Sequence, residues 1–174
     1  MNKRDLETEF EAKYNDYGNM LYKIAFLYLG NKSDCEDVLQ DVFTKYLTGK
    51  YKFKNTEHEK AWFIRVTQNK CLDYLKKSGR KNVCIDDVKE TDTYNYDETE
   101  QDIISKVIAL PVKYKSAIIL YYYNDYSVEE ISKTLKLSKS AVKKRLQRGR
   151  EILKIELEDY AIWKKMNLKN QLIT

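Results

Sequence analysis

The residues best suited to chemistry lie towards the C-terminal end, where cations gather on one short segment. Leu137 through Arg150 contains six basic residues and no acidic one. Lysine and arginine side chains pair with the phosphates of nucleic acids, and a helix N-terminus offers free backbone amides to the same oxygens. Solvated helix faces usually carry both signs, so the unmixed charge favours DNA binding over a plain surface. The residues that we expect to contact DNA are Ser138, Lys139, Ser140, Lys143, Lys144, Arg145, Gln147 and Arg148.

Two short helices with a tight turn between them would position these side chains. Ser127 is a favoured N-cap, and the acids at Glu129 and Glu130 suit the positive end of a helix dipole. Ser138 would cap the second helix in the same way. Apolar or small residues recur at helical spacing on the inner side of both helices: Val128, Ile131, Leu135, Val142, Leu146, Gly149 and Leu153. The segment 127–150 is therefore predicted to form a helix-turn-helix that binds DNA.

A second polar face is predicted on a helix from about Glu57 to Lys77. Its apolar side carries Ala61, Ile64, Cys71, Leu72 and Leu75, and the opposite side carries Trp62, Arg65, Asn69, Asp73 and Lys76, continued by Lys77, Arg80 and Lys81. An aromatic ring with amides and cations on one face suits contact with unpaired bases and their backbone. A core tryptophan beside a charged surface would give the same pattern, and the residues alone leave both interpretations open.

An acidic face is predicted on a helix that begins at Ser33, where Glu36 three residues later would complete a capping box. One side of this helix carries Asp34, Asp37 and Asp41, flanked by Glu36 and Gln40, and the other carries Cys35, Val38, Leu39, Val42 and Tyr46. No histidine, nucleophile or glycine-rich phosphate loop accompanies the carboxylates, which argues against catalysis. The face either docks a basic protein partner or is a solvated surface.

The composition of the 174-residue chain excludes several classes of protein. Its net charge of +5 comes from 32 basic and 27 acidic residues, so the distribution of charge matters more than its sum. His58 is the single histidine and the three cysteines have no CxxC spacing, so we expect no metal, no cofactor and no enzymatic activity. No apolar run reaches the ~20 residues of a membrane span or resembles an export signal, which predicts a soluble, cytoplasmic protein.

Few helix breakers interrupt the chain, which has five glycines and one proline, so the sequence predicts an all-α protein. Helical periodicity disappears across 79–97, where the acids are Asp86, Asp87, Glu90, Asp92 and Asp97. Such a segment buries too little apolar surface to offset its ordering entropy, which is typical of a flexible acidic linker. Two small helical domains are predicted on either side of it, at 1–78 and 98–160, followed by a tail at 161–174.

Taken in order, these segments resemble the extracytoplasmic-function (ECF) class of bacterial sigma factors, within the sigma-70 family. The resemblance is carried by Asp34–Phe43 (DCEDVLQDVF), by Ala61–Arg65 (AWFIR) with Asn69 and Asp73–Leu75, and by Leu110 through Arg150. It spans about residues 10–157, and the order and spacing of the three stretches make it specific. It implies a sigma region-2-like bundle in the N-terminal domain and a sigma region-4-like helix-turn-helix in the C-terminal domain.

The resemblance also implies a role for each matched face. Docking on core RNA polymerase would fall to Asp34, Asp37, Gln40, Asp41 and Phe43. Melting of the minus-ten promoter element and capture of its non-template strand would fall to Lys52, Lys54, Asn55, Trp62, Arg65, Asn69, Lys76, Lys77 and Arg80. The helix-turn-helix would bind the minus-thirty-five element as duplex DNA, and the linker would thread the polymerase channels. A further implied partner is an anti-sigma factor that masks both DNA-binding domains.

Some residues depart from the family's usual pattern, notably Ala141 and Lys144 in the recognition helix, so the promoter sequence itself is not predicted. A free-standing helix-turn-helix regulator is the alternative function. Such a regulator would bind a duplex operator tightly without polymerase, and it would leave the Trp62–Asn69 face without a role.

Overall fold

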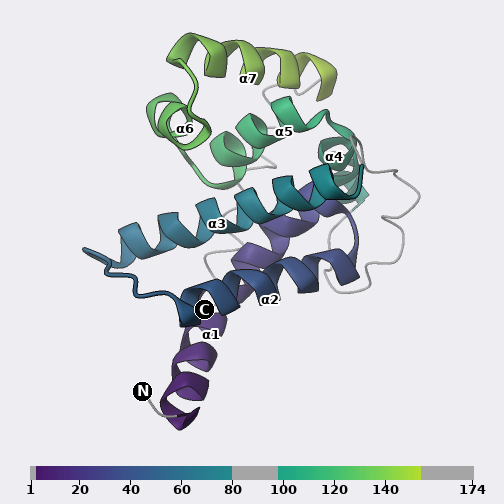
Figure 1. Cartoon of the computed structure of the whole chain (residues 1–174). Coiled ribbons are helices and arrows are strands. Elements are labelled where there is room, and N and C mark those ends of the chain that lie inside the picture. Colours follow the sequence, from purple (N-terminus) through teal and green to yellow (C-terminus); the bar gives the residue numbers. More distant parts are fainter. Residues whose placement is uncertain (1–2, 80–97, 154–174) are drawn as a thin grey trace. The chain divides into compact units, whose positions relative to one another are not determined.

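The computed structural model describes residues 3–79 and 98–153, and within these ranges the regular structure is helical throughout. The helices, in chain order, are α1 (Lys3–Leu29), α2 (Lys32–Thr48), α3 (Thr56–Lys77), α4 (Glu98–Ala109), α5 (Val112–Ile118), the π-helix η2 (Ile119–Tyr123), α6 (Val128–Leu135) and α7 (Lys139–Leu153). Figure 1 shows them along the chain. The expected all-α class is confirmed.

The chain divides into two compact units, Met1–Arg80 and Lys81–Thr174. The predicted linker at 79–97 falls outside the described residues except for Gly79, and so does the predicted tail at 161–174. Their boundaries and character stay predictions.

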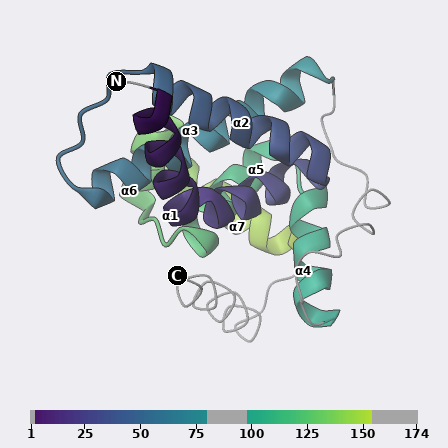
Figure 2. The ribbon, with the colours of Figure 1, turned by 90° about the horizontal axis from the view of Figure 1, so that it is seen from below.

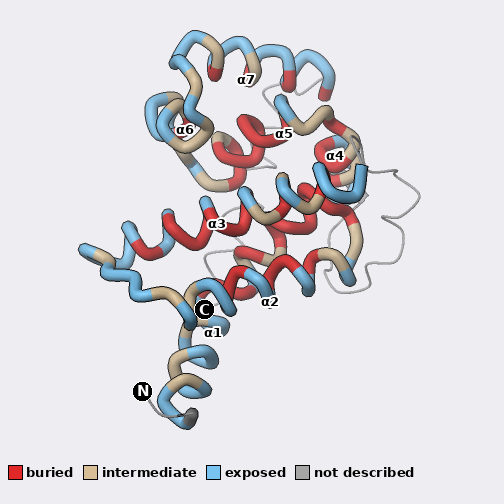
Figure 3. Tube along the Cα trace, viewed as in Figure 1, coloured by how far each residue is buried: buried red, intermediate tan, exposed pale blue. Residues whose placement is uncertain are grey.

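The first unit is a three-helix bundle in which α1, α2 and α3 each pack against the other two (Figures 1 and 2). Its centre is aromatic, because Phe43 of α2 and Phe63 of α3 are both buried and their ring centroids lie 5.6 Å apart. The first turns of α1 extend past α2 and α3, and their residues are mostly exposed (Figure 3). Phe10 and Tyr14 lie there, and both rings contact Phe43.

The start of α2 differs from the sequence-based expectation. The helix begins at Lys32, and Asn31 is its N-cap, whose side-chain oxygen accepts a hydrogen bond from the backbone amide of Asp34 at 2.9 Å. The predicted capping box of Ser33 and Glu36 is therefore wrong, and Glu36 instead pairs with Lys32 at 3.7 Å. The preceding Gly30 has φ +74, which lets the chain turn sharply from α1 to the cap.

A buried carboxylate links the three helices of the first unit. Glu59 of α3 is only 8% exposed, and it accepts hydrogen bonds from Lys13 Nζ at 2.8 Å and from the Tyr17 hydroxyl at 2.9 Å. The Tyr46 hydroxyl of α2 lies 3.5 Å from the same group and 3.0 Å from Glu9 of α1. Burial, then the hydrogen bond to Glu59, raises the pKa of Tyr17. The free-energy cost of burying this carboxylate is offset because a lysine and two hydroxyls donate hydrogen bonds to it.

The second unit packs α5 against α7 and α6 against α7. Gly149 permits the first contact, since a Cβ at this position would lie 2.8 Å from Cγ1 of Ile118. Pro111 precedes α5, and the chain continues from α5 directly into the π-helix η2. Lys115 of α5 is fully buried, and its ammonium donates a 2.6 Å hydrogen bond to the carbonyl of Ile108 near the end of α4.

The predicted cap of α6 is confirmed. The Ser127 hydroxyl accepts from the backbone amide of Glu130 at 3.2 Å, and the Glu130 carboxylate accepts from the backbone amide of Ser127 at 2.8 Å. The helix ends at Lys136, which has the left-handed conformation with φ +53. This conformation lets Leu137 follow directly into the tight turn before α7, although glycine would adopt it at lower cost.

Candidate nucleic-acid interface

Helix α7 presents the basic face that the sequence predicts. Val142, Leu146, Gly149 and Leu153 are buried on its inner side. The Ser138 hydroxyl caps the helix by accepting from the backbone amide of Ala141 at 3.1 Å, and it also lies 3.1 Å from the Ser140 hydroxyl. The solvent side carries Lys139, Ser140, Lys143, Lys144, Gln147 and Arg148, all exposed, whereas Arg145 is half-buried.

The cations of α7 differ in how they are paired. Among the described residues, neither Lys143 nor Lys144 has a hydrogen bond or an ion pair. Arg145 instead donates to the backbone carbonyl of Lys113 at 3.4 Å. Lys143 and Lys144 are therefore the cations of α7 that are most available to a phosphate or a base edge.

Two carboxylates accept from Lys139, Gln147 and Arg148 of α7. Glu129 of α6 lies 3.1 Å from Lys139 and 3.1 Å from Lys133, and hydrogen bonds from these two lysines lower its pKa. Glu151 of α7 accepts from Arg148 at 2.8 Å and from Gln147 at 3.2 Å. The hydrogen bond from Arg148 is the main cause that lowers the pKa of Glu151.

Helix α3 presents the predicted polar face, but without its aromatic residue. Arg65, Asn69 and Lys76 are exposed, and Lys76 lies 4.0 Å from Asp73. Trp62 is only 7% exposed, so of the two interpretations that the residues leave open the structure favours a core tryptophan beside a charged surface. Ala61, expected on the apolar side, is exposed instead. The exposed face of α3 therefore carries polar and charged groups together with the small side chain of Ala61, and no aromatic ring.

The burial of Trp62 follows from the loop that precedes α3. Residues 49–55 place Tyr51 and Phe53 against the indole, with ring centroids 4.4 Å and 5.8 Å away, and Phe63 lies 5.1 Å away on the helix. The pattern along α3 could not predict this cover, because it comes from residues outside the helix. Trp62 is thus a core residue of the first unit.

Tyr51 is the aromatic residue that the sequence analysis missed. Its side chain remains 38% exposed while it covers Trp62. Gly49 makes room for it, since a Cβ at this position would overlap the tyrosine ring. Lys50, Lys52 and Lys54 are exposed around it. The alternation of aromatic and basic residues in this loop is the signal that could have identified it.

Asn55, which is predicted to contact DNA, is also the N-cap of α3. Its side-chain oxygen accepts from the backbone amide of His58 at 2.8 Å and so caps α3. The backbone amide of Lys54 also donates to Nδ1 of His58 at 3.3 Å. These contacts fix the end of the loop that carries Tyr51. Lys77 is exposed at the other end of α3, whereas Arg80 lies outside the described residues.

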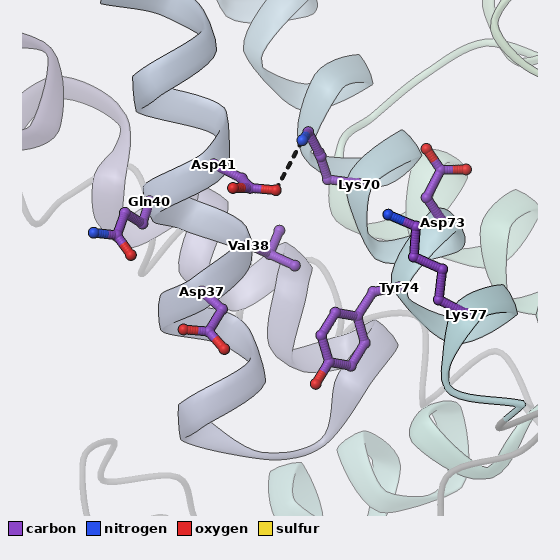
Figure 4. A pocket seen from close by; sticks show the side chains of 8 residues that line it. All are labelled: Asp37, Val38, Gln40, Asp41, Lys70, Asp73, Tyr74 and Lys77. Atoms are coloured by element: carbon purple, nitrogen blue, oxygen red, sulfur yellow. Dashed lines mark hydrogen bonds and ion pairs between the residues drawn. The ribbon is translucent and has the colours of Figure 1, made fainter.

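A charged groove of about 260 Å³ separates the exposed sides of α2 and α3 (Figure 4). Its walls are formed by Asp37, Val38, Gln40 and Asp41 of α2 and by Lys70, Asp73, Tyr74 and Lys77 of α3. Asp41 reaches across to Lys70 at 2.8 Å, whereas Gln40 points away from α3. Asp37 and Gln40 are exposed and have no hydrogen bond or ion pair among the described residues.

Two residues predicted on this acidic face lie elsewhere. Phe43 is 2% exposed in the aromatic core, because it continues the stripe of Cys35, Val38, Leu39 and Val42 by one more helical step. Asp34 is half-buried, where it accepts from the Tyr74 hydroxyl and from Nδ2 of Asn31 at 2.6 Å. Both residues support α2 from within the bundle, and the exposed face is left to Asp37, Gln40 and Asp41.

The described residues include no group of three or more histidine, cysteine or acidic side chains that could hold a metal ion. Cys35 and Cys71 are buried free thiols, and burial raises the pKa of Cys35. None of the described helices is both long and apolar enough to cross a membrane.

Comparison with known proteins shows the family to which the chain belongs. The family model for sigma-70 region 2 matches residues 14–81, and the model for sigma-70 region 4 matches residues 100–153. The chain belongs to the sigma-70 family of RNA polymerase sigma factors. The two matches together cover more than half of the chain, and they fall on the α1–α3 bundle and on the α4–α7 unit.

Its relatives include ECF sigma factors, as the sequence predicted. RNA polymerase sigma factor SigV of Bacillus subtilis is 28% identical over 144 residues, which cover 82% of this chain and 87% of that protein. ECF RNA polymerase sigma factor SigX of the same species is 25% identical, over 88% of this chain and 86% of that protein. The sigma factor RpoE of Bartonella quintana, solved with the anti-sigma factor NepR, has the same fold (TM-score 0.64, 21% identity, 83% of this chain and 94% of that chain).

Proposed function

We propose that this sigma factor is of the ECF type, that a face on α2 docks on core RNA polymerase, and that faces on α3 and α7 divide promoter recognition. The observation that carries the proposal is the pairing of two faces on one bundle. An acidic face with unpaired Asp37 and a cationic, amide-bearing face with Arg65 and Asn69 lie on adjacent helices of the first unit. A second unit adds an exposed basic helix. This combination fits a protein that joins an enzyme to DNA.

The acidic face of α2 would dock on core RNA polymerase. Asp37, Gln40 and Asp41 are exposed and offer carboxylate and amide oxygens to a basic surface. Asp34 and Phe43 would contribute indirectly, because they hold α2 in place. Lys70 engages Asp41 at 2.8 Å in the free protein, so that carboxylate would change partners on docking. Asp37 would therefore make the first contact.

The face of α3 and the preceding loop would act on the minus-ten element. Tyr51 would provide the ring on which an unpaired base stacks, and Trp62 would support it from beneath. Cations and amides around the ring would hold the backbone of the melted non-template strand: Lys52, Lys54, Asn55, Arg65, Asn69, Lys76, Lys77 and Arg80. A base can stack on any aromatic face, so sequence preference would come from the polar groups.

Helix α7 would bind the minus-thirty-five element as duplex DNA. Lys143 and Lys144 have no ion pair within the described residues, and Ser140 lies in the first turn, where a recognition helix meets base edges. Lys139 and Arg148 would add phosphate contacts after leaving Glu129 and Glu151. Such a factor would act in the cytoplasm, beside the chromosome. A protein inhibitor that covers these faces would regulate it, as NepR is bound to the RpoE relative.

Run-off transcription with purified bacterial core polymerase and genomic fragments of the source organism tests the proposal. The wild-type chain should direct promoter-dependent transcripts, and Asp37→Ala with Asp41→Ala should reduce both core binding and transcript yield. Asp16→Asn, an exposed acid on α1, is the matched control and should leave both unchanged. Tight binding to a duplex operator without polymerase, together with no transcript, would favour a free-standing regulator instead.

A further inference from the structure

The recognition face of the second unit contains acids as well as cations. Three acidic residues lie between Ser127 and Leu153, namely Glu129, Glu130 and Glu151. Glu130 is committed to the capping box of α6. The other two each bridge a pair of donors at the surface. Neither Glu129, which also suits the helix dipole, nor Glu151 belongs to that box, and both pair with donors on the recognition face.

Each of these carboxylates is bound as a DNA phosphate would be. Glu129 directs one oxygen to Lys133 and the other to Lys139, each at 3.1 Å. Glu151 likewise directs one oxygen to Gln147 at 3.2 Å and the other to Arg148 at 2.8 Å. Charge-assisted bonds of this kind are the ones that lysine and arginine make to phosphate oxygens. Three of the side chains expected to contact DNA are thus already occupied: Lys139, Gln147 and Arg148.

We propose that Glu129 and Glu151 occupy phosphate positions on the helix-turn-helix and thereby weaken its binding to duplex DNA of any sequence. The proposal rests on the proposed function only in taking α7 as the DNA-binding helix. For DNA to engage Lys139 and Arg148, the phosphate must displace a carboxylate that remains nearby and repels it. Lys143 and Lys144 carry no such partner and would remain for the first contact.

The second unit of this sigma factor would therefore bind duplex DNA weakly by itself. Exposed ion pairs contribute little to folding, so Glu129 is not needed to hold α6 against α7, and Glu151 bonds only within α7. Their effect appears only when a polyanion approaches. Because each acid acts through charge and not through a base edge, it should affect a promoter duplex and a scrambled duplex equally.

The test uses the full chain and fluorescence anisotropy with two labelled duplexes, one containing a minus-thirty-five element selected from the chain's own transcribed promoters and one scrambled. Glu129→Gln and Glu151→Gln should each tighten binding to both duplexes by about threefold, the size of effect expected of an exposed ion pair. Each should also make log affinity fall more steeply with log salt, by about one for each cation released. The double variant should combine both effects.

The matched control is Asp102→Asn, which removes an exposed carboxylate of the same unit. Asp102 pairs with Lys106 of α4 at 2.5 Å, and neither residue belongs to the recognition face. Its effect on affinity should stay below that of either glutamine variant. Circular dichroism should show equal helix content in all four variants.

Equal affinities for Glu129→Gln, Glu151→Gln and Asp102→Asn would overturn the proposal. So would a loss of affinity, because it would mean that the acids orient Lys139 and Arg148 for DNA. Failure of the proposed function gives a different result. In that case the wild-type chain directs no transcript, but the variants still differ in affinity for the scrambled duplex. No binding by any variant at low salt would overturn both the assignment of α7 and this inference.

Discussion

Replacement of Glu59 by glutamine should destabilise the first unit selectively. The carboxylate is 8% exposed and accepts short hydrogen bonds from Lys13 and Tyr17, with Tyr46 at 3.5 Å. An amide of the same shape can accept from one of these donors, but it leaves the Lys13 ammonium without its counter-charge. Removal of one partner of a fully buried ion pair costs roughly 3–5 kcal/mol. The Lys13 side chain is 24% exposed, so we expect a smaller loss of about 2 kcal/mol.

Urea unfolding followed by tryptophan fluorescence measures this loss. Trp62 lies in the first unit and Trp163 is the other tryptophan of the sequence, so Trp163→Phe as a background leaves a signal that comes from the bundle alone. Glu57→Gln is the matched control, because Glu57 is exposed in the first turn of the same helix. Its cost should be about 0.5 kcal/mol or less. A free energy of unfolding that falls no further in Glu59→Gln than in Glu57→Gln would refute the role given to the buried carboxylate.

Three further outcomes are expected. Burial, followed by hydrogen bonds to glutamates, raises the pKa of Tyr17 and Tyr46 above the ordinary 10.0. The folded state holds these protons more tightly, so the stability of the first unit should be constant below about pH 10 and fall above it, with a smaller fall in Tyr17→Phe. Lys136→Gly should stabilise the second unit by about 0.5–1 kcal/mol in thermal melts, because φ +53 suits glycine; an unchanged melting temperature would argue against strain there. Tyr51→Ala should slow promoter melting, with a loss of about 1–3 kcal/mol in binding to single-stranded minus-ten DNA, while binding to core polymerase stays equal; equal single-strand affinity would exclude a stacking role.

The helix-turn-helix was predictable because its signals are local. Ser127 and Glu130 form the box that their spacing indicates, and the stripe of Val142 and Leu146 is buried as its period requires. The end of α6 was harder to predict from the sequence. Its C-cap, Lys136, adopts the left-handed backbone conformation, for which glycine is the usual signal.

The residues misplaced in the first unit each have a cause of their own. Trp62 lies on the polar side of α3 by periodicity, yet Tyr51 and Phe53 from the preceding loop cover it. A helical wheel records one helix and cannot include such a cover. For Phe43 the spacing along α2 did indicate a buried position in the apolar stripe. It was placed on the docking face because the family resemblance implied a docking role for it. The cap at Asn31 was missed because two residues only two positions apart, Asn31 and Ser33, are both good N-caps.

Transcription from two versions of one promoter tests the central claim most directly. Core polymerase with the wild-type chain should transcribe from a fully paired template and from one whose minus-ten element is already unpaired. Asn69→Ala, on the exposed face of α3, should lose yield on the paired template and recover part of it on the unpaired one. Lys144→Ala, on α7, should lose yield on both. Two results would contradict the division of promoter recognition between the two units. One is transcription that does not depend on the wild-type chain on either template. The other is an equal loss of yield for Asn69→Ala on both templates.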